Sequence, residues 1–214
     1  VESFNATLIN TLTGFKYIGE KIKEFEETNS NTFIFGLEES YGYLAGTFVR
    51  DKDAVVAATL ITEMTLYYKE KGLTLYEALI NLYEEYGYTK EALVSIELQG
   101  KEGQAKIAKC IDTLRNDKVT EINGIKVVKA FDYKLSEEVT YENNDMIKSE
   151  INLPKSNVLK YILEDDSWFV VRPSGTEPKM KVYLSIVGES LKSSEEKINA
   201  FKEDVMNKIN NILN

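Results

Sequence analysis

A ten-residue stretch near the end of the chain, residues 172–181, combines groups that suit a phosphate. Its sequence is RPSGTEPKMK. An arginine guanidinium presents a planar fork that can bind two phosphate oxygens at once, hydroxyls can donate to the others, and lysines add positive charge. The stretch therefore predicts an anion site, and its candidate ligands are Arg172, Ser174, Gly175, Thr176 and Lys179.

Two prolines and a glycine should shape this loop. Pro173 and Pro178 fix their own φ angles and restrict the residues before them, so we expect a stiff loop. Gly175 can adopt a positive φ, and successive N–H groups in such a turn can form an anion-binding nest. Residues 172–181 hold three basic and one acidic side chain in a protein of net charge −9. An ordinary rigid hairpin with incidental charge is the alternative interpretation.

A second stretch offers acceptors for sugar hydroxyls. Glu38, Glu39 and Ser40 follow one another between Gly36 and Gly42. Carboxylates suit vicinal hydroxyls, because each hydroxyl must donate a hydrogen bond somewhere once the sugar is desolvated. A solvated acidic loop explains the same residues. The stretch alone therefore leaves both interpretations open.

Composition excludes several classes of chemistry. The chain has no histidine, which excludes Ser-His, Cys-His and His-metal sites, and the two acids in Asp51-Lys52-Asp53 are too few to predict a metal site. Its net negative charge argues against a general nucleic-acid or membrane-surface binder, and no apolar run is long enough to span a membrane. A single cysteine, Cys110, fits a reducing cytoplasm and a buried structural thiol.

The elements that must position these residues fall into two groups that meet at Gly87. Hydrophobic periodicity and turn residues predict an α/β unit over residues 1–87 and an antiparallel α+β domain over residues 88–214. The first group comprises strands at 4–11 and 32–35, a loop at 36–42, and helices at 15–27, 54–69 and 74–86. The second comprises strands at 93–98, 126–131, 157–163, 168–171 and 182–187, helices at 104–115 and near 193–213, and an irregular loop at 140–154.

Some of these elements carry sharper expectations. Thr13 suits the N-cap of the helix over residues 15–27. Thr74 and Glu77 have the spacing of a capping box at the start of the helix over residues 74–86. The helix over residues 54–69 is apolar nearly all round, which predicts that it is well buried.

Three of the stretches described above resemble motifs of the phosphohexomutases, the phosphoglucomutase and phosphomannomutase family. The loop from Arg172 to Lys179 resembles the phosphate-binding loop of their last domain. The Glu-Glu-Ser stretch resembles their sugar-recognition loop, although Leu37 stands where many members carry glycine. Thr13 and Gly14 resemble their Thr-Gly loop. Residue by residue, the resemblance implies that Arg172, Ser174, Gly175, Thr176 and Lys179 bind phosphate, and that Glu38, Ser40, Thr13 and Gly14 bind the sugar.

The resemblance implies a fold and an extent. Residues 1–87 would be the last part of an α/β/α third domain, and residues 88–214 a complete fourth domain of the TATA-box-binding-protein-like kind. The family's serine segment and its aspartate-rich metal site have no match here. Because the chain starts at Val1 without methionine, we expect a C-terminal fragment whose N-terminal domains are its partners.

The implied activity is that of the bacterial α-phosphoglucomutase group, which interconverts glucose 1-phosphate and glucose 6-phosphate. A phosphoserine and Mg²⁺ held by the missing domains would act through glucose 1,6-bisphosphate, so this fragment alone should be inactive. The substrate class is a phosphorylated hexose, with no nucleic acid or membrane partner. The alternatives are a phosphomannomutase, a non-catalytic phosphosugar-binding module, and an interaction domain whose loops are only turns.

Overall fold

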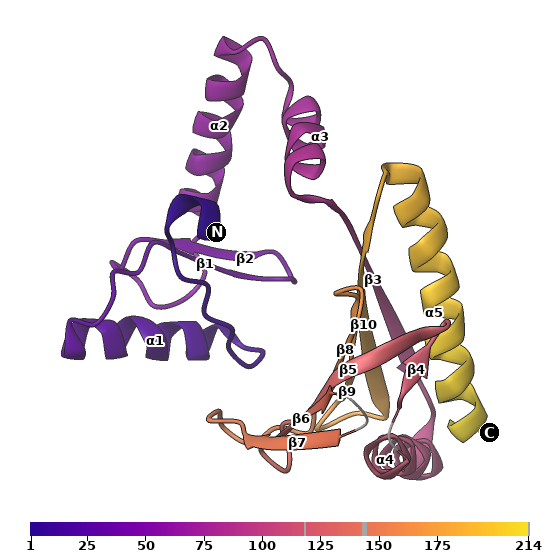
Figure 1. Ribbon diagram of the computed structural model, residues 1–214. Helices are drawn as coiled ribbons and strands as arrows, with labels where there is room; N and C mark the ends of the chain where they lie inside the picture. Colours follow the sequence, from indigo (N-terminus) through magenta and orange to yellow (C-terminus); the bar gives the residue numbers. More distant parts are fainter. Residues whose placement is uncertain (118, 143–144, 214) are drawn as a thin grey trace. The chain divides into compact units, whose positions relative to one another are not determined.

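The computed structural model describes residues 1–117, 119–142 and 145–213 (Figure 1). The chain divides into two compact units, Val1–Asn81 and Leu82–Asn214, and each has its own cluster of buried apolar side chains. In the first unit the cluster consists of Phe15, Ile22 and Leu44. Its elements are a 3₁₀ helix (Glu2–Phe4), α1 (Phe15–Thr28), β1 (Phe35–Glu38), β2 (Gly42–Ala45), α2 (Ala54–Glu70) and the start of α3 (Leu75–Tyr86).

Side-chain caps fix the starts of two helices. Asp53 accepts hydrogen bonds from the N–H groups of Val55 and Val56 and so caps α2. The predicted capping box of α3 is confirmed: the Glu77 carboxylate accepts from the Thr74 N–H at 2.8 Å, and the Thr74 hydroxyl accepts from the Glu77 N–H at 3.2 Å. The bond from the Thr74 N–H, together with one from the Thr74 hydroxyl to the same carboxylate, lowers the pKa of Glu77.

Several expectations for the first unit are wrong. Residues 4–11 form no strand, because a strand needs a partner and the described residues offer none beside them. The strand expected at 32–35 lies at Phe35–Glu38 and pairs with β2, so the expected loop at 36–42 is a hairpin. Helix α2 packs on β2 but has no fully buried residue, because the described chain supplies no second layer to cover its apolar surface.

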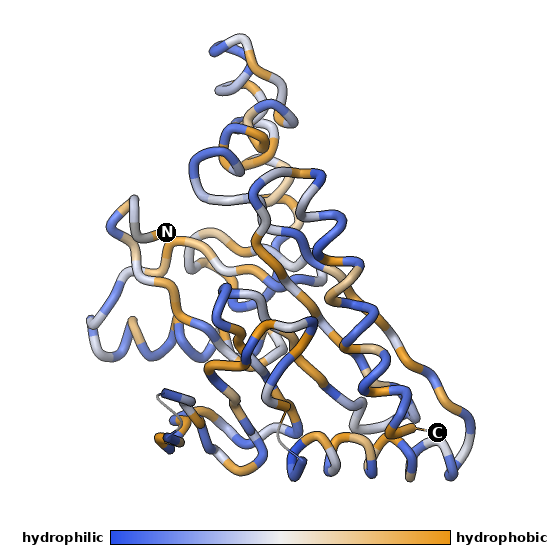
Figure 2. The backbone as a smooth tube through the Cα atoms, turned by 45° about the vertical axis from the view of Figure 1, so that its right-hand side comes forward, coloured by the Kyte–Doolittle hydropathy of each residue, from blue (hydrophilic) through white to orange (hydrophobic). Residues whose placement is uncertain are grey.

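The second unit is built on an antiparallel sheet, as the sequence predicts. Among the described residues, seven strands follow the order β3-β10-β9-β8-β5-β6-β7, and β4 adds to β5. Alternate side chains of the central strands point into one core that they share with helices α4 and α5. Along the C-terminal helix α5, hydrophobic residues (orange in Figure 2) recur between hydrophilic ones (blue). The strands are β3 (Tyr88–Glu97), β4 (Glu121–Ile122), β5 (Ile125–Asp132), β6 (Glu137–Glu142), β7 (Asp145–Glu150), β8 (Leu159–Leu163), β9 (Trp168–Pro173) and β10 (Lys179–Gly188); the helices are α4 (Gly100–Asn116) and α5 (Leu191–Leu213).

One expectation for this unit is wrong. The stretch at 140–154, predicted to be an irregular loop, contributes to two paired strands, β6 and β7; residues 143–144 lie outside the described part of the chain. Every side chain of β7 is exposed, so this edge strand carries no alternation of buried and exposed residues for a sequence pattern to reveal. Cys110 is buried on α4 as predicted, and burial raises the pKa of its thiol to about 11.

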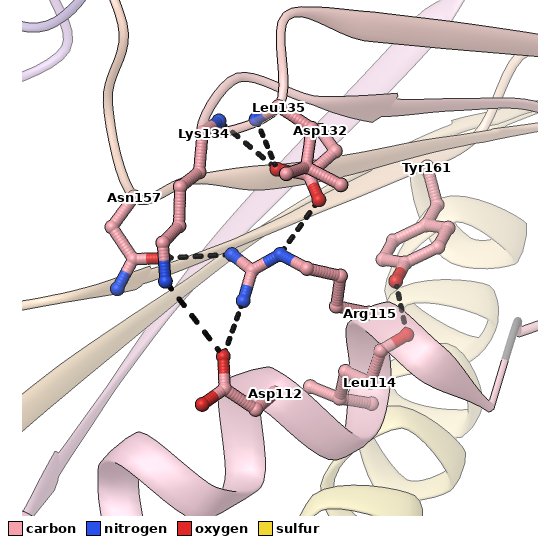
Figure 3. Close-up of polar contacts among 8 residues, drawn as sticks. All are labelled: Asp112, Leu114, Arg115, Asp132, Lys134, Leu135, Asn157 and Tyr161. Atoms are coloured by element: carbon pink, nitrogen blue, oxygen red, sulfur yellow. Dashed lines mark hydrogen bonds and ion pairs between the residues drawn. The ribbon is translucent and has the colours of Figure 1, made fainter.

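A network of polar contacts ties α4 to the sheet (Figure 3). The side chain of Arg115 is only 9% exposed and pairs with Asp132 of β5 at 2.6 Å, while its other nitrogens donate to Asp112 and to Asn157. Next to it, the Tyr161 hydroxyl donates to the Leu114 carbonyl at 3.0 Å. The network therefore fixes α4 against β5 and against the segment that leads into β8.

Loss of the Arg115 side chain should destabilise the second unit. Arg115→Met leaves the mostly buried Asp132 carboxylate without its ion-pair partner, with only the N–H groups of Lys134 and Leu135 still donating to it, which should cost about 3 kcal/mol of unfolding free energy. Urea unfolding measures this loss. Asp112→Asn is the control, since the Asp112 side chain is 58% exposed and its pair should contribute less than about 1 kcal/mol. Equal losses in the two variants would contradict the structural role of the Arg115–Asp132 pair.

Candidate functional site

The candidate phosphate loop is the tight connection between β9 and β10. The Ser174 N–H donates to the Lys179 carbonyl at 2.7 Å, and the Lys179 N–H donates to the Glu177 carbonyl at 2.7 Å. At the neighbouring strand, the Leu98 N–H donates to the Pro178 carbonyl at 3.0 Å. The loop is thus closed on itself and attached to the chain that follows β3.

The Ser174 hydroxyl organises the inside of the loop. Its oxygen accepts from the N–H groups of Thr176 and Glu177, at 3.4 and 3.3 Å, so the hydroxyl hydrogen can still be donated to a ligand. Gly175 does not adopt the positive φ that the nest hypothesis invokes, because these turn contacts aim the following N–H groups at Ser174. A Cβ at Gly175 would meet open space, and its N–H has no hydrogen-bond partner among the described residues.

Two cations lie directly opposite each other where the loop begins. The β9–β10 register pairs Arg172 with Lys181, and side chains of directly opposed residues project from the same face of a sheet. Within the part of the chain that the structure describes, neither side chain has a hydrogen-bond or ion-pair partner. Because like charges in this position destabilise a sheet, the pair would be stabilised by an anion bound between them.

The third cation of the loop has a different environment. The Lys179 ammonium lies 3.3 Å from a carboxylate oxygen of Glu177 and 3.4 Å from one of Glu97. Hydrogen bonds to these two carboxylates, the first to Glu177, raise the pKa of Lys179, so the ammonium stays charged. Unlike Arg172 and Lys181, Lys179 is therefore already paired without a ligand.

A small cavity of about 160 Å³ adjoins the loop. One wall consists of loop residues that include Ser174 and Gly175, and the other consists of α4 residues and Asn157. Asn157 is the residue whose amide oxygen accepts from Arg115 in the network of Figure 3. The network that fixes α4 therefore also holds one wall of this cavity in place.

The candidate sugar loop is the turn of the β1–β2 hairpin. Glu38 pairs with Gly42 across the hairpin, its side chain is half-buried, and Ser40 is exposed at the tip. A Cβ at Gly36 would lie 2.8 Å from the Ile18 side chain, so glycine is needed there for β1 to approach α1. The hairpin thus presents Glu38 and Ser40 on a tip whose base is fixed to the helix.

Lys52 connects this hairpin to the start of α1. A Cβ at Gly42 would lie 2.7 Å from the Lys52 side chain and 3.0 Å from a Glu38 carboxylate oxygen, which shows how closely these groups approach. The Lys52 ammonium lies 2.6 Å from Asp51 and 5.3 Å from the centre of the Phe15 ring. Bonding to Asp51, and more weakly the charge of Glu38, raise the pKa of Lys52.

Thr13 and Gly14 immediately precede Phe15 and α1. Gly14, with a φ of 125°, is the N-cap residue and makes no side-chain cap, so the prediction that Thr13 caps the helix is wrong. That φ favours glycine, and the backbone turns there in a way that places the cap one residue later than expected. Thr13 is exposed.

Sequence reasoning assigned no role to Lys52 and treated Lys181 only as added charge. The position of Lys181 opposite Arg172 follows from the hairpin register, in which six residues, 174–179, separate the last paired positions, Pro173 and Met180. No sequence pattern could have predicted that Lys52 lies near Glu38, because this approach depends on tertiary packing. Among residues 1–117, 119–142 and 145–213, no group of three or more Cys, Asp or Glu side chains could hold a metal ion.

Two family models match separate parts of the chain. The family model for the phosphoglucomutase/phosphomannomutase alpha/beta/alpha domain III matches residues 1–86, and the model for the C-terminal domain of that family matches residues 111–208. No described helix is both long and apolar enough to cross a membrane.

Curated relatives carry the name phosphoglucomutase. The chain is 40% identical over 185 residues to the protein of Staphylococcus haemolyticus and 40% identical over 196 residues to that of Staphylococcus aureus strain RF122, covering 86% and 92% of this chain. It spans only 33% and 35% of those proteins. A solved structure of pp63/parafusin from Paramecium, a phosphoglucomutase in its open form, has a TM-score of 0.62 and 17% identity, over 99% of this chain and 35% of that one. The chain therefore belongs to the phosphoglucomutase/phosphomannomutase family.

Proposed function

We propose that this chain is the substrate-recognition part of a phosphoglucomutase. The observation that carries the proposal is the pair of cations at the base of the loop, Arg172 and Lys181, which have no partner among the described residues, together with the Ser174 hydroxyl of that loop, which can donate to a ligand. A phosphate dianion would bind both charges and accept from Ser174, Thr176 and the Gly175 N–H. The curated relatives at 40% identity support glucose as the hexose, while the family model covers phosphomannomutases as well.

The reaction that this site would serve is the interconversion of glucose 1-phosphate and glucose 6-phosphate. A phosphoserine transfers its phosphoryl group to the free sugar hydroxyl, which gives glucose 1,6-bisphosphate and a free serine. The other phosphoryl group then returns to the serine, and its sugar oxygen takes up the proton. In each step one phosphate does not react, and the loop from Arg172 to Lys179 would hold that phosphate.

The hairpin tip would hold the sugar. Glu38 can accept hydrogen bonds from two vicinal hydroxyls, and the Ser40 hydroxyl can donate or accept. Thr13 and Gly14 would complete this part of the site at the start of α1. Because the sugar must bind in two orientations, carboxylates that can accept from hydroxyls in either orientation suit this role.

The remaining catalytic groups would come from parts of the full-length protein outside this chain. No group of three or more metal-ligating side chains occurs among the described residues, and the family's serine segment has no match in this sequence, so we assign both Mg²⁺ and the phosphoserine to N-terminal domains. Apolar side chains exposed on α2, among them Val55, Ile61 and Leu66, offer a surface on which the rest of the third domain could pack. We place the boundary between the third and fourth domains at residues 87 and 88, and the enzyme in the cytoplasm.

Replacing Arg172 tests the phosphate loop. Arg172→Lys keeps the charge but loses the bidentate fork, so it should weaken binding of glucose 6-phosphate, and Arg172→Ala should weaken it further, by roughly 2–4 kcal/mol. Amide chemical shifts of the 214-residue chain during titration report both the affinity and the location of the ligand. Lys208→Ala, which removes an exposed lysine of α5, is the control. Ligand-induced shifts that cluster away from residues 172–181, or that persist unchanged in Arg172→Ala, would disprove the proposed site.

Replacing Glu38 tests the sugar loop. In the full-length protein, Glu38→Gln should lower kcat/KM roughly tenfold to a hundredfold, since one charged hydrogen bond contributes about 1.5–3 kcal/mol. The melting temperature should change little, because Glu38 lies near an exposed hairpin tip. Glu203→Gln, on the exposed surface of α5, is the matched control. A large fall in melting temperature with normal turnover per folded molecule would show that Glu38 has a structural role instead.

A further inference from the structure

Glu97 lies beside the phosphate loop, although it belongs to the neighbouring strand. The β3–β10 register places it directly opposite Lys179, and the next residue, Leu98, donates its N–H to the loop carbonyl of Pro178 at 3.0 Å. Two independent backbone constraints thus keep the Glu97 carboxylate close to the Lys179 ammonium, at 3.4 Å. The Glu97 side chain is 62% exposed.

The pairing of Lys179 changes the charge that a ligand meets. Lys179 lies between Glu97 and Glu177, whereas Arg172 and Lys181 have no partner among the described residues. The loop sequence has an excess of two positive charges, and adding Glu97 reduces this excess to one. A phosphate that enters the loop therefore competes with two carboxylates for the Lys179 ammonium.

We propose that Glu97 sets the phosphate affinity of the loop by holding Lys179 and keeping it from full engagement with the ligand. This proposal rests on the proposed function, in which the loop must grip one phosphate and then release it so that the other can take its place. A loop in which Glu177 alone held Lys179 would bind the dianion more tightly and would delay that exchange. Glu97 thus acts as an affinity-setting residue and does not itself contact the substrate.

Glu97→Gln is the test, because it removes the charge and keeps the size of the side chain. In the 214-residue chain it should tighten the binding of glucose 6-phosphate by about two- to fivefold, the range expected for an exposed ion pair. The gain should shrink as the salt concentration rises. Amide shift titration measures the affinity, and a side-chain NMR signal of Lys179 shows whether its ammonium responds to the ligand.

The spectroscopic signal separates this role from general charge removal. The Lys179 signal should move with added glucose 6-phosphate much more in Glu97→Gln than in the unchanged chain. Glu91→Gln is the matched control, because Glu91 is an exposed glutamate six residues away on the same face of β3, opposite Ser185. It should leave both the affinity and the Lys179 signal unchanged.

The possible results distinguish this inference from the proposed function. If the unchanged chain shows no ligand-induced shifts in residues 172–181, the proposed phosphate site is wrong and the role of Glu97 falls with it. If those shifts occur but Glu97→Gln binds with equal or weaker affinity, only the inference about Glu97 is overturned. Tighter binding without movement of the Lys179 signal would also overturn it, because Glu97 would then act without Lys179.

Discussion

The pairing of β10 with β9 and β3 is the constraint on which the phosphate loop depends. Val171, Val182 and Leu184 point into the core from these strands, so a slip of one residue would turn an apolar row outward and Arg172 inward. Burial therefore fixes the register, and the register places Arg172 opposite Lys181. The free energy that holds the two like charges together comes from the core beneath them.

The sugar-binding hairpin depends on a different kind of constraint. Its two strands have four residues each and form little core, so its position is fixed by close contacts at glycines and by ion pairs. Arg50 contributes such a pair, because its guanidinium binds both oxygens of Glu26 on α1 at 2.7 and 2.6 Å. This brings the segment that carries Lys52 up to the helix and so to Glu38.

The sequence predicts the second unit better than the first, for a physical reason. Strands β8 and β9 and the first half of β10 bury alternate side chains, which produces a pattern that can be recognised without a structure. Helix α2 is apolar on all sides in sequence, yet it is exposed here, because burial depends on a layer that the described chain does not contain. The residue types and their order in the motif were enough to predict Arg172 and Ser174 as phosphate ligands. The pairing of Lys179 with Glu97 could not be predicted in this way, because it depends on the register between β10 and β3.

The outer strands of the sheet have a consequence for the behaviour of the protein in solution. β3 and β7 end the strand order, and the outer edge of such a strand offers N–H and C=O groups that could recruit a strand from another molecule. Both strands carry exposed charged side chains, including Glu91 on β3 and Lys148 and Glu150 on β7. These charges disfavour pairing with a strand of another molecule and so protect the sheet from aggregation. In β7 the same exposure of every side chain explains why no sequence pattern predicted the strand.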